Sequence, residues 1–569
     1  MSKLSVFLTE LRRRKVGRVA ALYAAVGVTI SLAAAELYDV LLLPAWTPRL
    51  IIFLLVLGFP VALLLAWAYE VAPEKGVEVP TAPVRGDLRE EVDETEGLQA
   101  VADSTAAGRS IVVLPFLDMS PSADQEYFSD GLAEDVINAL THIKDFRVAA
   151  RTSAFSFKGE QIDAREIGRK LSVSTVLEGS VQRVGDRLRV TAQLIDAQEG
   201  YHLWSEQYDR VMADVFSIQD EITAAIVEAM KIELLDRERS AVSKRYTENL
   251  DAYQLYLKGR HHWNRSTTDG YWKAIDLFQE AIRTDPSYAL AYTGLADAYA
   301  SLGDAGHSAV SPKEAFSAAR AATMKALELD EGLSEAHATL GHLMMHEFAW
   351  SDAEKEFRRA IELNPNYATA YRFLAGFFAA VGRSREAIVT LEKALDLDPV
   401  CLGTLTDLGV IHYFAREYDQ AIAHYQEVLE MAPEFARAHV TLSSAYVKKG
   451  LYAEAIGEIE RAMEISGDRG KLAALGRAYA AAGRKDEAAQ VVDELKDLSK
   501  ERYVTPYAFT LIYASMGEKD EAMTWLRQAC DQGVSDLIYL KVDPFLDGLR
   551  DDPRFALLLN KIGMEEACG

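Results

Sequence analysis

The chain carries one pattern three times, in LGHLMMHEFAWSDAEKEFRRAIELNP (340–365), LAGFFAAVGRSREAIVTLEKALDLDP (374–399) and LGVIHYFAREYDQAIAHYQEVLEMAP (408–433). Each copy begins with leucine and a small residue, ends in proline, and follows the previous copy after 34 residues. Proline stops a helix because it cannot donate the next helical hydrogen bond. A period of this length is typical of stacked helical hairpins, each of which buries its apolar side against its neighbours. The pattern therefore predicts an all-α solenoid.

Small residues at fixed positions predict how each hairpin closes. In the first helix, the small residue after the leucine lets the second helix come close. In the second helix, a bulky residue follows an alanine by one helical turn and fills the seam between the two helices. The small residues of the first helices are Gly341, Ala375 and Gly409, and the bulky residues are Phe357, Leu391 and Tyr425.

This pattern resembles the tetratricopeptide repeat over about half of the chain. Degenerate copies on both sides predict about eight hairpins over residues 250–532. Residues 533–569, which include IYLKVDPFLDGL (538–549), resemble the closing segment of many bacterial arrays. Such a cap covers the apolar face that a terminal hairpin would otherwise expose. The resemblance implies a concave groove that binds other proteins or extended peptides.

The helical register, read as in the family, places one set of side chains on the concave side of the array. Four of them are cations and two are aromatic rings, in a chain of net charge −25. They suit an extended peptide with acidic and apolar groups. The alternative is that they are ordinary exposed residues. The predicted groove residues are His342, Met345, His346, Arg372, Tyr413, Phe414, Arg437, Lys448 and Arg477.

Few residues of the chain stand in a pattern that could serve catalysis or bind a metal. His342 and His346 share a helix face and could hold a metal, but the sequence shows no third ligand. Glu134 and Asp135 are adjacent carboxylates, for which we expect a solvated helix face. Phosphate loops, nucleophile elbows and zinc-hydrolase motifs are absent from the sequence. We therefore predict no metal, no cofactor and no enzymatic activity.

Residues 109–235 predict a small α/β domain. Apolar runs at 110–117 and 146–150 read as buried strands, and helices are expected at 130–140 and 215–235. Two alternating stretches, 175–184 and 187–196, flank Gly185-Asp186, which predicts a hairpin.

This domain resembles the amino-terminal domain of the TolB type. The resemblance rests on VVLPF (112–116), YFSDGLAEDVINAL (127–140), RVAARTSAFSFKG (147–159) and the stretch from Val176 to Arg210. In bacteria such domains stand beside tetratricopeptide arrays, behind a DNA-binding domain, a cyclase domain or a membrane anchor. The resemblance leaves room for a small ligand of the α/β domain.

The first 70 residues differ in composition from the rest of the chain. A basic tail at 1–18 precedes two apolar runs, at 19–43 and 50–69. Each run approaches the ~20 residues that a membrane helix needs. We expect two transmembrane helices, then an acidic linker at 70–108 whose composition favours disorder. A cleavable signal peptide is the alternative for the first run, and the second apolar run argues against it.

Basic residues predict the orientation of these two helices. Six of them precede the first run, and only Arg49 lies in the link between the runs. The positive-inside rule then places the soluble domains in the cytoplasm, at the bacterial inner membrane. If the first run is not inserted, the soluble domains are periplasmic instead.

Overall composition narrows the choice of partners. The net charge of −25 argues against nucleic acid. The three cysteines lack metal-ligand spacing, so no disulfide or zinc framework is expected. These features predict a non-enzymatic inner-membrane scaffold that binds proteins in signalling or envelope processes. One alternative is a ligand sensor that acts through the α/β domain, and a weaker one is an adenylate-cyclase relative that lacks the catalytic domain.

Overall fold

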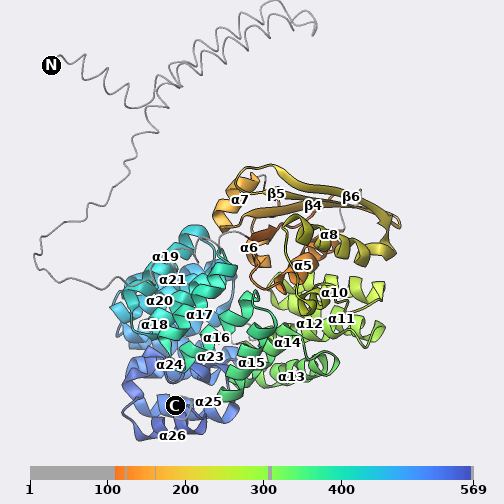
Figure 1. Cartoon of the computed structure of the whole chain (residues 1–569). Helices are drawn as coiled ribbons and strands as arrows, with labels where there is room; N and C mark the ends of the chain where they lie inside the picture. The colour runs from red at the N-terminus through yellow and green to blue at the C-terminus, as the bar shows by residue number, and fades with distance from the viewer. Residues whose placement is uncertain (1–108, 122–124, 161, 305–309, 565–569) are drawn as a thin grey trace, which may run out of the picture. The chain divides into compact units, whose positions relative to one another are not determined.

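The computed structural model describes residues 109–121, 125–160, 162–304 and 310–564 (Figure 1). An α/β domain comes first and a helical array follows it. The elements of the α/β domain are β1 (Ser110–Val113), β2 (Leu117–Asp118), α5 (Glu126–Thr141), β3 (Arg147–Val148), α6 (Arg151–Phe155), α7 (Ala164–Leu171), β4 (Thr175–Val184), β5 (Arg187–Asp196), β6 (His202–Val211), a 3-10 turn (Met212–Asp214), α8 (Val215–Ala229) and α9 (Asp236–Val242).

The sheet of the α/β domain combines parallel and antiparallel strands, in the order β3-β1-β4-β5-β6, with β2 paired to β4. Strand β1 runs parallel to β3 and β4, whereas β4, β5 and β6 form an antiparallel meander. Gly185 turns the chain between β4 and β5 at φ 62°, a conformation that costs glycine no steric strain. The predicted hairpin of these two strands is confirmed. The predicted strand at 110–117 is shorter, because β1 ends at Val113.

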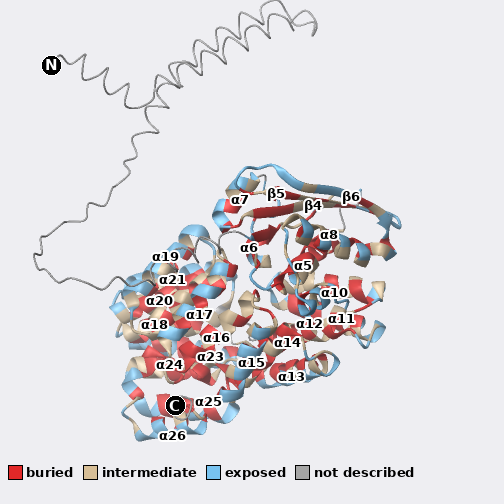
Figure 2. Ribbon diagram, viewed as in Figure 1, coloured by how far each residue is buried: buried red, intermediate tan, exposed pale blue. Residues whose placement is uncertain are grey.

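Two helices cover the inner face of this sheet. Leu132 and Val136 of α5 and Ile218 and Ile222 of α8 are fully buried, each pair at the four-residue spacing that keeps both side chains on one helix face. Most residues of the edge strand β6 stay exposed, as Figure 2 shows along the outer side of the sheet. The domain therefore has one covered face and one solvated edge.

Within the described residues, eight helical hairpins run from Leu250 to Gln532. The two helices of each pair contact each other, and Figure 2 shows buried and exposed residues alternating along them. The predicted solenoid of helical hairpins is confirmed. The pairs are α10 (Leu250–Trp263) with α11 (Thr268–Thr284), α12 (Ala289–Gly303) with α13 (Pro312–Leu329), α14 (Ser334–His346) with α15 (Trp350–Leu363), α16 (Ala368–Ala380) with α17 (Ser384–Leu397), α18 (Leu402–Phe414) with α19 (Tyr418–Met431), α20 (Ala436–Lys449) with α21 (Tyr452–Ser466), α22 (Leu472–Ala481) with α23 (Lys485–Leu498), and α24 (Pro506–Met516) with α25 (Lys519–Gln532).

A small residue beneath an aromatic ring sets the spacing within the hairpins. A Cβ atom placed on Gly409 would lie 2.4 Å from the ring of Tyr425, and one on Gly341 would lie 2.7 Å from the ring of Phe357. Both rings are buried almost completely. The helices can approach this closely only because the small residue leaves room for the ring.

The array ends in three short elements. Two 3-10 turns, Ser535–Tyr539 and Pro544–Leu549, precede α26 (Pro553–Lys561). Helix α26 lies against α25, with Lys561 paired to Asp531 at 2.7 Å. Beyond α26, the carbonyl of Ile562 accepts a hydrogen bond of 2.8 Å from the indole of Trp350 at the start of α15. The carboxyl-terminal region thus reaches back to the third hairpin.

The α/β domain rests on the proline-containing turns between hairpins. Asn366 donates from Nδ2 to the carbonyl of Thr141 at 3.0 Å. Asp398 accepts from the backbone and the hydroxyl of Ser153 at 2.9 and 2.5 Å. Asn366 and Asp398 flank prolines of the 34-residue pattern. The turns that end the second helices therefore also hold the preceding domain.

Glu134 and Asp135 correct one prediction, because they do not lie on a solvated helix face. Glu134 is 7% exposed and pairs with Arg151, while the amide of Asn264 donates to it at 2.9 Å. Asp135 accepts from Gln219 at 2.6 Å and from the Tyr253 hydroxyl. Both carboxylates are enclosed because the first hairpin packs on α5, a contact that local sequence does not reveal.

The predicted fold class is also corrected with respect to the membrane. Among the residues that the structure describes, no helix is both long enough and apolar enough to cross a bilayer. The longest, α13, has 18 residues and carries charges along its length. The two segments predicted as transmembrane helices, 19–43 and 50–69, lie outside the described residues. The fold described is therefore an α/β domain followed by a helical solenoid, without the two membrane helices.

Replacing Gly409 with alanine tests the hairpin seam. The added methyl group would meet the buried ring of Tyr425, so we expect a loss of roughly 1–3 kcal/mol in the free energy of unfolding, measured by urea denaturation. Gly457→Ala is the matched control, because Gly457 lies on a helix with open space around the site. There alanine should stabilise the chain by up to about 1 kcal/mol. Equal effects at both sites would show that the seam is looser than described.

Asp135 predicts a pH dependence of stability. Burial raises the pKa of Asp135 from 3.8 to about 7, and the hydrogen bond from Tyr253 opposes that rise. Because the folded-state pKa is the higher one, the stability that the protonated group contributes is complete below pH 4 and is lost as the pH rises through 7. Asp135→Asn should therefore reduce the difference in unfolding free energy between pH 5 and pH 8 by roughly 1–2 kcal/mol. The exposed Asp276→Asn should leave that difference unchanged, and equal curves for all three proteins would contradict the assignment.

Candidate functional site

The first helices of successive hairpins line the concave side of the array, and residues 535–550 lie against them. We call residues 535–550 the groove segment. Its first 3-10 turn contacts α14 and its second contacts α24. The side chains of Leu537, Leu540 and Leu546 are fully buried. A polypeptide of the same chain therefore occupies part of the predicted binding surface.

Two basic side chains hold the backbone of the groove segment. Arg416 donates from Nη1 to the carbonyl of Val542 at 2.5 Å and pairs through Nη2 with Asp547 at 2.6 Å. Lys448 donates from Nζ to the carbonyl of Pro544 at 2.9 Å. Backbone carbonyls are present in every polypeptide, so these contacts recognise an extended chain more than a particular sequence.

Aromatic rings supply the side-chain contacts of the groove segment. The ring of Phe545 lies under two cations, with Lys448 Nζ at 4.1 Å and the Arg477 guanidinium at 4.7 Å from its centroid. The rings of Phe414 and Tyr539 are 4.9 Å apart. A cation over an aromatic face is attracted by the ring quadrupole, more strongly where water is excluded.

Burial changes the acid–base behaviour of Lys448. It lowers the pKa of Lys448 to about 8, while Asp543 and Asp547 of the groove segment oppose that shift. At neutral pH the ammonium group is still protonated and can donate to Pro544. The segment thus contributes the negative charges that keep a half-buried lysine charged.

Arg372 and Arg437 meet at one carboxylate. Arg372 donates from Nε to Asp407 at 2.6 Å, and Arg437 pairs with the other oxygen of the same group. Burial alone would raise the pKa of Asp407, but the two guanidinium groups lower it below its ordinary value. These two cations are therefore already partnered within the array, and Asp407 was absent from the predicted set.

Three other predicted groove residues are enclosed rather than open to solvent. Met345, Tyr413 and His346 are 5%, 6% and 9% exposed. Burial lowers the pKa of His346 to about 3, and the neighbouring His342 lowers it further. The backbone of Ser535, at the start of the groove segment, opposes this shift and raises the pKa of His346. The structure therefore brings Phe414, Lys448 and Arg477 together around the groove segment, whereas Met345, Tyr413 and His346 offer little exposed surface.

Arg416 was missed by the sequence analysis, although the repeat contains a signal for it. The turns between paired helices place a left-handed residue every 34 positions, namely Phe348, Gly382, Arg416 and Gly450. Glycine adopts this conformation without strain, whereas other residues pay about 1 kcal/mol or more. Arg416 takes the strained position and uses its side chain to hold Val542 and Asp547. A non-glycine residue at a glycine turn is a signal of special contacts.

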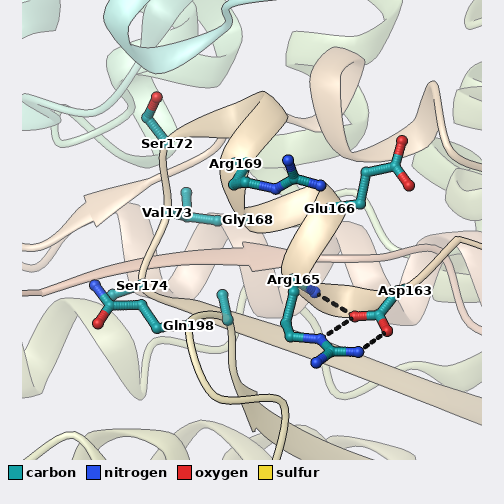
Figure 3. Close-up of a pocket in the computed structure, with 10 residues that line it drawn as sticks. Asp163, Arg165, Glu166, Gly168, Arg169, Ser172, Val173, Ser174 and Gln198 are labelled. Carbon is teal, nitrogen blue, oxygen red and sulfur yellow. Dashed lines mark hydrogen bonds and ion pairs between the residues drawn. The ribbon is translucent and has the colours of Figure 1, made fainter. Parts of the chain in front are cut away.

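A hollow of about 770 Å³ lies beside α7 on the α/β domain (Figure 3). Two of its four charged lining residues are turned to each other, since Arg165 pairs with Asp163 through Nε at 2.9 Å and Nη2 at 2.6 Å. Both side chains are more than half exposed. Groups that satisfy each other at the surface do not converge on a ligand. The predicted small ligand of the α/β domain stays a prediction.

Comparison with known proteins identifies the repeats. A tetratricopeptide repeat family model matches residues 350–400 and 406–469. Putative adenylate cyclase 3 of Rhizobium meliloti is 39% identical over 186 residues, 33% of this chain and 32% of that protein. Hsp70-Hsp90 organizing protein 3 of Arabidopsis thaliana is 31% identical over 18% of this chain and 19% of that protein. The chain thus spans a third or less of the length of these two relatives.

One solved structure is similar to this chain at a low level. YrrB, described as a TPR protein with an unusual peptide-binding site, matches 34% of this chain and 94% of its own length, with 21% identity and a TM-score of 0.24. The family match and the eight hairpins confirm tetratricopeptide repeats. The resemblance of the α/β domain to the TolB type stays a prediction.

Proposed function

We propose that this chain is a non-catalytic scaffold that binds a protein partner on the concave face of its tetratricopeptide array. The observation that carries the proposal is the groove segment itself. Arg416 and Lys448 bind its backbone carbonyls, and Phe414, Lys448 and Arg477 contact its aromatic rings. A surface built to hold one irregular polypeptide has the chemistry to hold another of the same kind.

The groove segment also indicates what the partner resembles. It carries Asp543 and Asp547 beside Tyr539 and Phe545, in a short irregular stretch. The concave residues that meet it are cationic and aromatic. A partner segment with acidic residues next to an aromatic ring would satisfy the same contacts. The peptide with acidic and apolar groups expected from the sequence has this composition.

The groove segment and a partner compete for the concave face, because both bind the same surface. While the groove segment is docked, the face is blocked to a partner. The partner's apparent association constant is therefore its intrinsic value multiplied by the fraction of chains in which the segment is released. Weakening the segment without touching the array should therefore strengthen partner binding. Damage to the array residues should weaken binding even though it also loosens the segment.

Protein-binding relatives support this role. Hsp70-Hsp90 organizing protein, similar over 18% of this chain, is named for organising two other proteins. Stacked helical hairpins present extended concave surfaces that suit such work.

Two double variants of the full chain test the proposal. In the segment variant, Tyr539→Ala with Phe545→Ala removes the rings that the array holds. In the groove variant, Arg416→Gly with Lys448→Ala removes the side chains that hold the segment, and glycine suits the left-handed turn. Partners captured by the wild-type chain from its native extract are identified, and their affinities for each purified variant are then measured. We expect several-fold tighter binding to the segment variant and several-fold weaker binding to the groove variant.

Arg358→Ala with Lys393→Ala is the matched control. Both residues lie on second helices and are about half exposed, so this variant should bind like the wild type. Circular dichroism and urea denaturation check that each variant stays folded. Equal affinity of the segment and groove variants would mean that partners dock elsewhere, and the groove would then be excluded as their site.

Nucleotide cyclisation is the second candidate function, because of the likeness to a putative adenylate cyclase. The likeness covers only 32% of that protein. Incubation of the purified chain with ATP and Mg²⁺, with chromatography for a cyclic product, separates the two candidates. Product formation would replace the scaffold proposal with an enzymatic one.

A further inference from the structure

Three metal-binding side chains meet where the second and third hairpins join. His342 and His346 lie one turn apart on α14, with ring centroids 4.6 Å apart. Asp304 follows the end of α12, and its Oδ1 lies 3.4 Å from His342 Nε2. One possible ligand atom from each of the three residues lies within 4.8 Å of the others. The sequence showed the two histidines but not the carboxylate, which belongs to an irregular stretch outside the repeat pattern.

Two buried polar atoms at this place lack a partner. Among the described residues, Nδ1 of His346 and Oγ of Ser535 receive no hydrogen bond and donate none. His346 is 9% exposed and Ser535 is 4% exposed. A small cavity of about 10 Å³ is lined by both Asp304 and Ser535. Buried polar atoms are nearly always satisfied, so an unpartnered imidazole nitrogen in this cluster and an unpartnered hydroxyl at the cavity indicate a species that belongs there.

We propose that Asp304, His342 and His346 bind a divalent transition-metal ion, with Zn²⁺ the best match. Two imidazoles and one carboxylate are a ligand set that zinc and its neighbours accept, whereas Ca²⁺ and Mg²⁺ prefer oxygen alone. With bonds of about 2.1 Å, ligand atoms around a tetrahedral zinc lie roughly 3.4 Å apart. The His342–Asp304 distance already has this value.

The three ligand atoms need to move only a short distance to bind one ion. The three ligand atoms all lie within 4.8 Å of one another, so no separation has to close by much more than 1 Å. Asp304 can supply much of this movement, since its side chain is 48% exposed. The two imidazoles are held in place by aromatic neighbours, His342 stacked on Phe373 and His346 beside Phe316, each at 4.9 Å.

The position of the metal gives it a structural role. It would join α12 to α14, two elements of successive hairpins, next to the serine at which the groove segment begins. Metal binding should therefore raise the melting temperature of the array, because an ion that binds only the folded state stabilises it by mass action. This role does not depend on the proposed partner binding.

Titration of the untagged full chain with Co²⁺ tests the site. Cobalt is a spectroscopic probe for zinc sites, and its tetrahedral complexes absorb visible light strongly. We expect one equivalent of Co²⁺ to give this absorption, Zn²⁺ to displace it, and either ion to raise the melting temperature. Asp304→Asn should abolish the absorption while the chain stays folded, because this side chain is half exposed. His342→Ala should do the same.

His412→Ala with His424→Ala is the matched control, since these stacked rings lie 5.2 Å apart on other helices. That variant should bind Co²⁺ like the wild type. Loss of absorption in the control, retention in Asp304→Asn, or no saturable binding by the wild-type chain would each overturn the proposal. The last result would assign the cavity to water.

Discussion

A small residue packed beneath a buried ring is the constraint on which the rest of this molecule depends. Gly409 under Tyr425 and Gly341 under Phe357 fix how closely two helices approach. A small residue against a bulky one recurs every 34 residues, with Ala375 and Leu391 in the repeat between them, and this recurrence stacks the hairpins and creates a concave side. The position of that side then determines which residues face it, and so where Arg416, Lys448 and Arg477 can meet a polypeptide. Because interiors are close-packed, each seam tolerates little change in volume.

Two other parts of the chain pack against the turns at the ends of the stacked helices. The α/β domain rests on the turns at the ends of second helices, where Asn366 and Asp398 offer polar groups. The groove segment contacts the array near the left-handed turns that follow the first helices. Its leucines are buried as deeply as those of the hairpins, so it belongs to the folded array as much as it resembles a ligand. A partner that binds the concave face as proposed would have to replace this apolar contact.

Local and periodic features could be predicted from the sequence. The 34-residue pattern predicted the hairpins. The alternating pattern on both sides of Gly185 predicted β4 and β5 with the bounds that the structure shows.

Contacts between distant segments could not be predicted. Nothing near Lys448 indicates that Pro544, 96 residues later, covers it. Asp304 stands in an irregular stretch, so no periodicity links it to His342. Glu134 was expected in solvent because its partner Asn264 is 130 residues away. Apolar runs indicated membrane helices, and among the described helices none has that character.

The central claim is that the concave face holds residues 535–550. Its most direct test is hydrogen exchange of the full chain. The amides of Leu540 and Val542 donate within the segment, to Leu537 and Tyr539, and the first helices of the array exclude water from them. If the segment is held there, peptides covering residues 537–549 should exchange as slowly as those covering α18 and α20. Exchange of these peptides at the rate of an unstructured chain, while α18 and α20 stay protected, would contradict it.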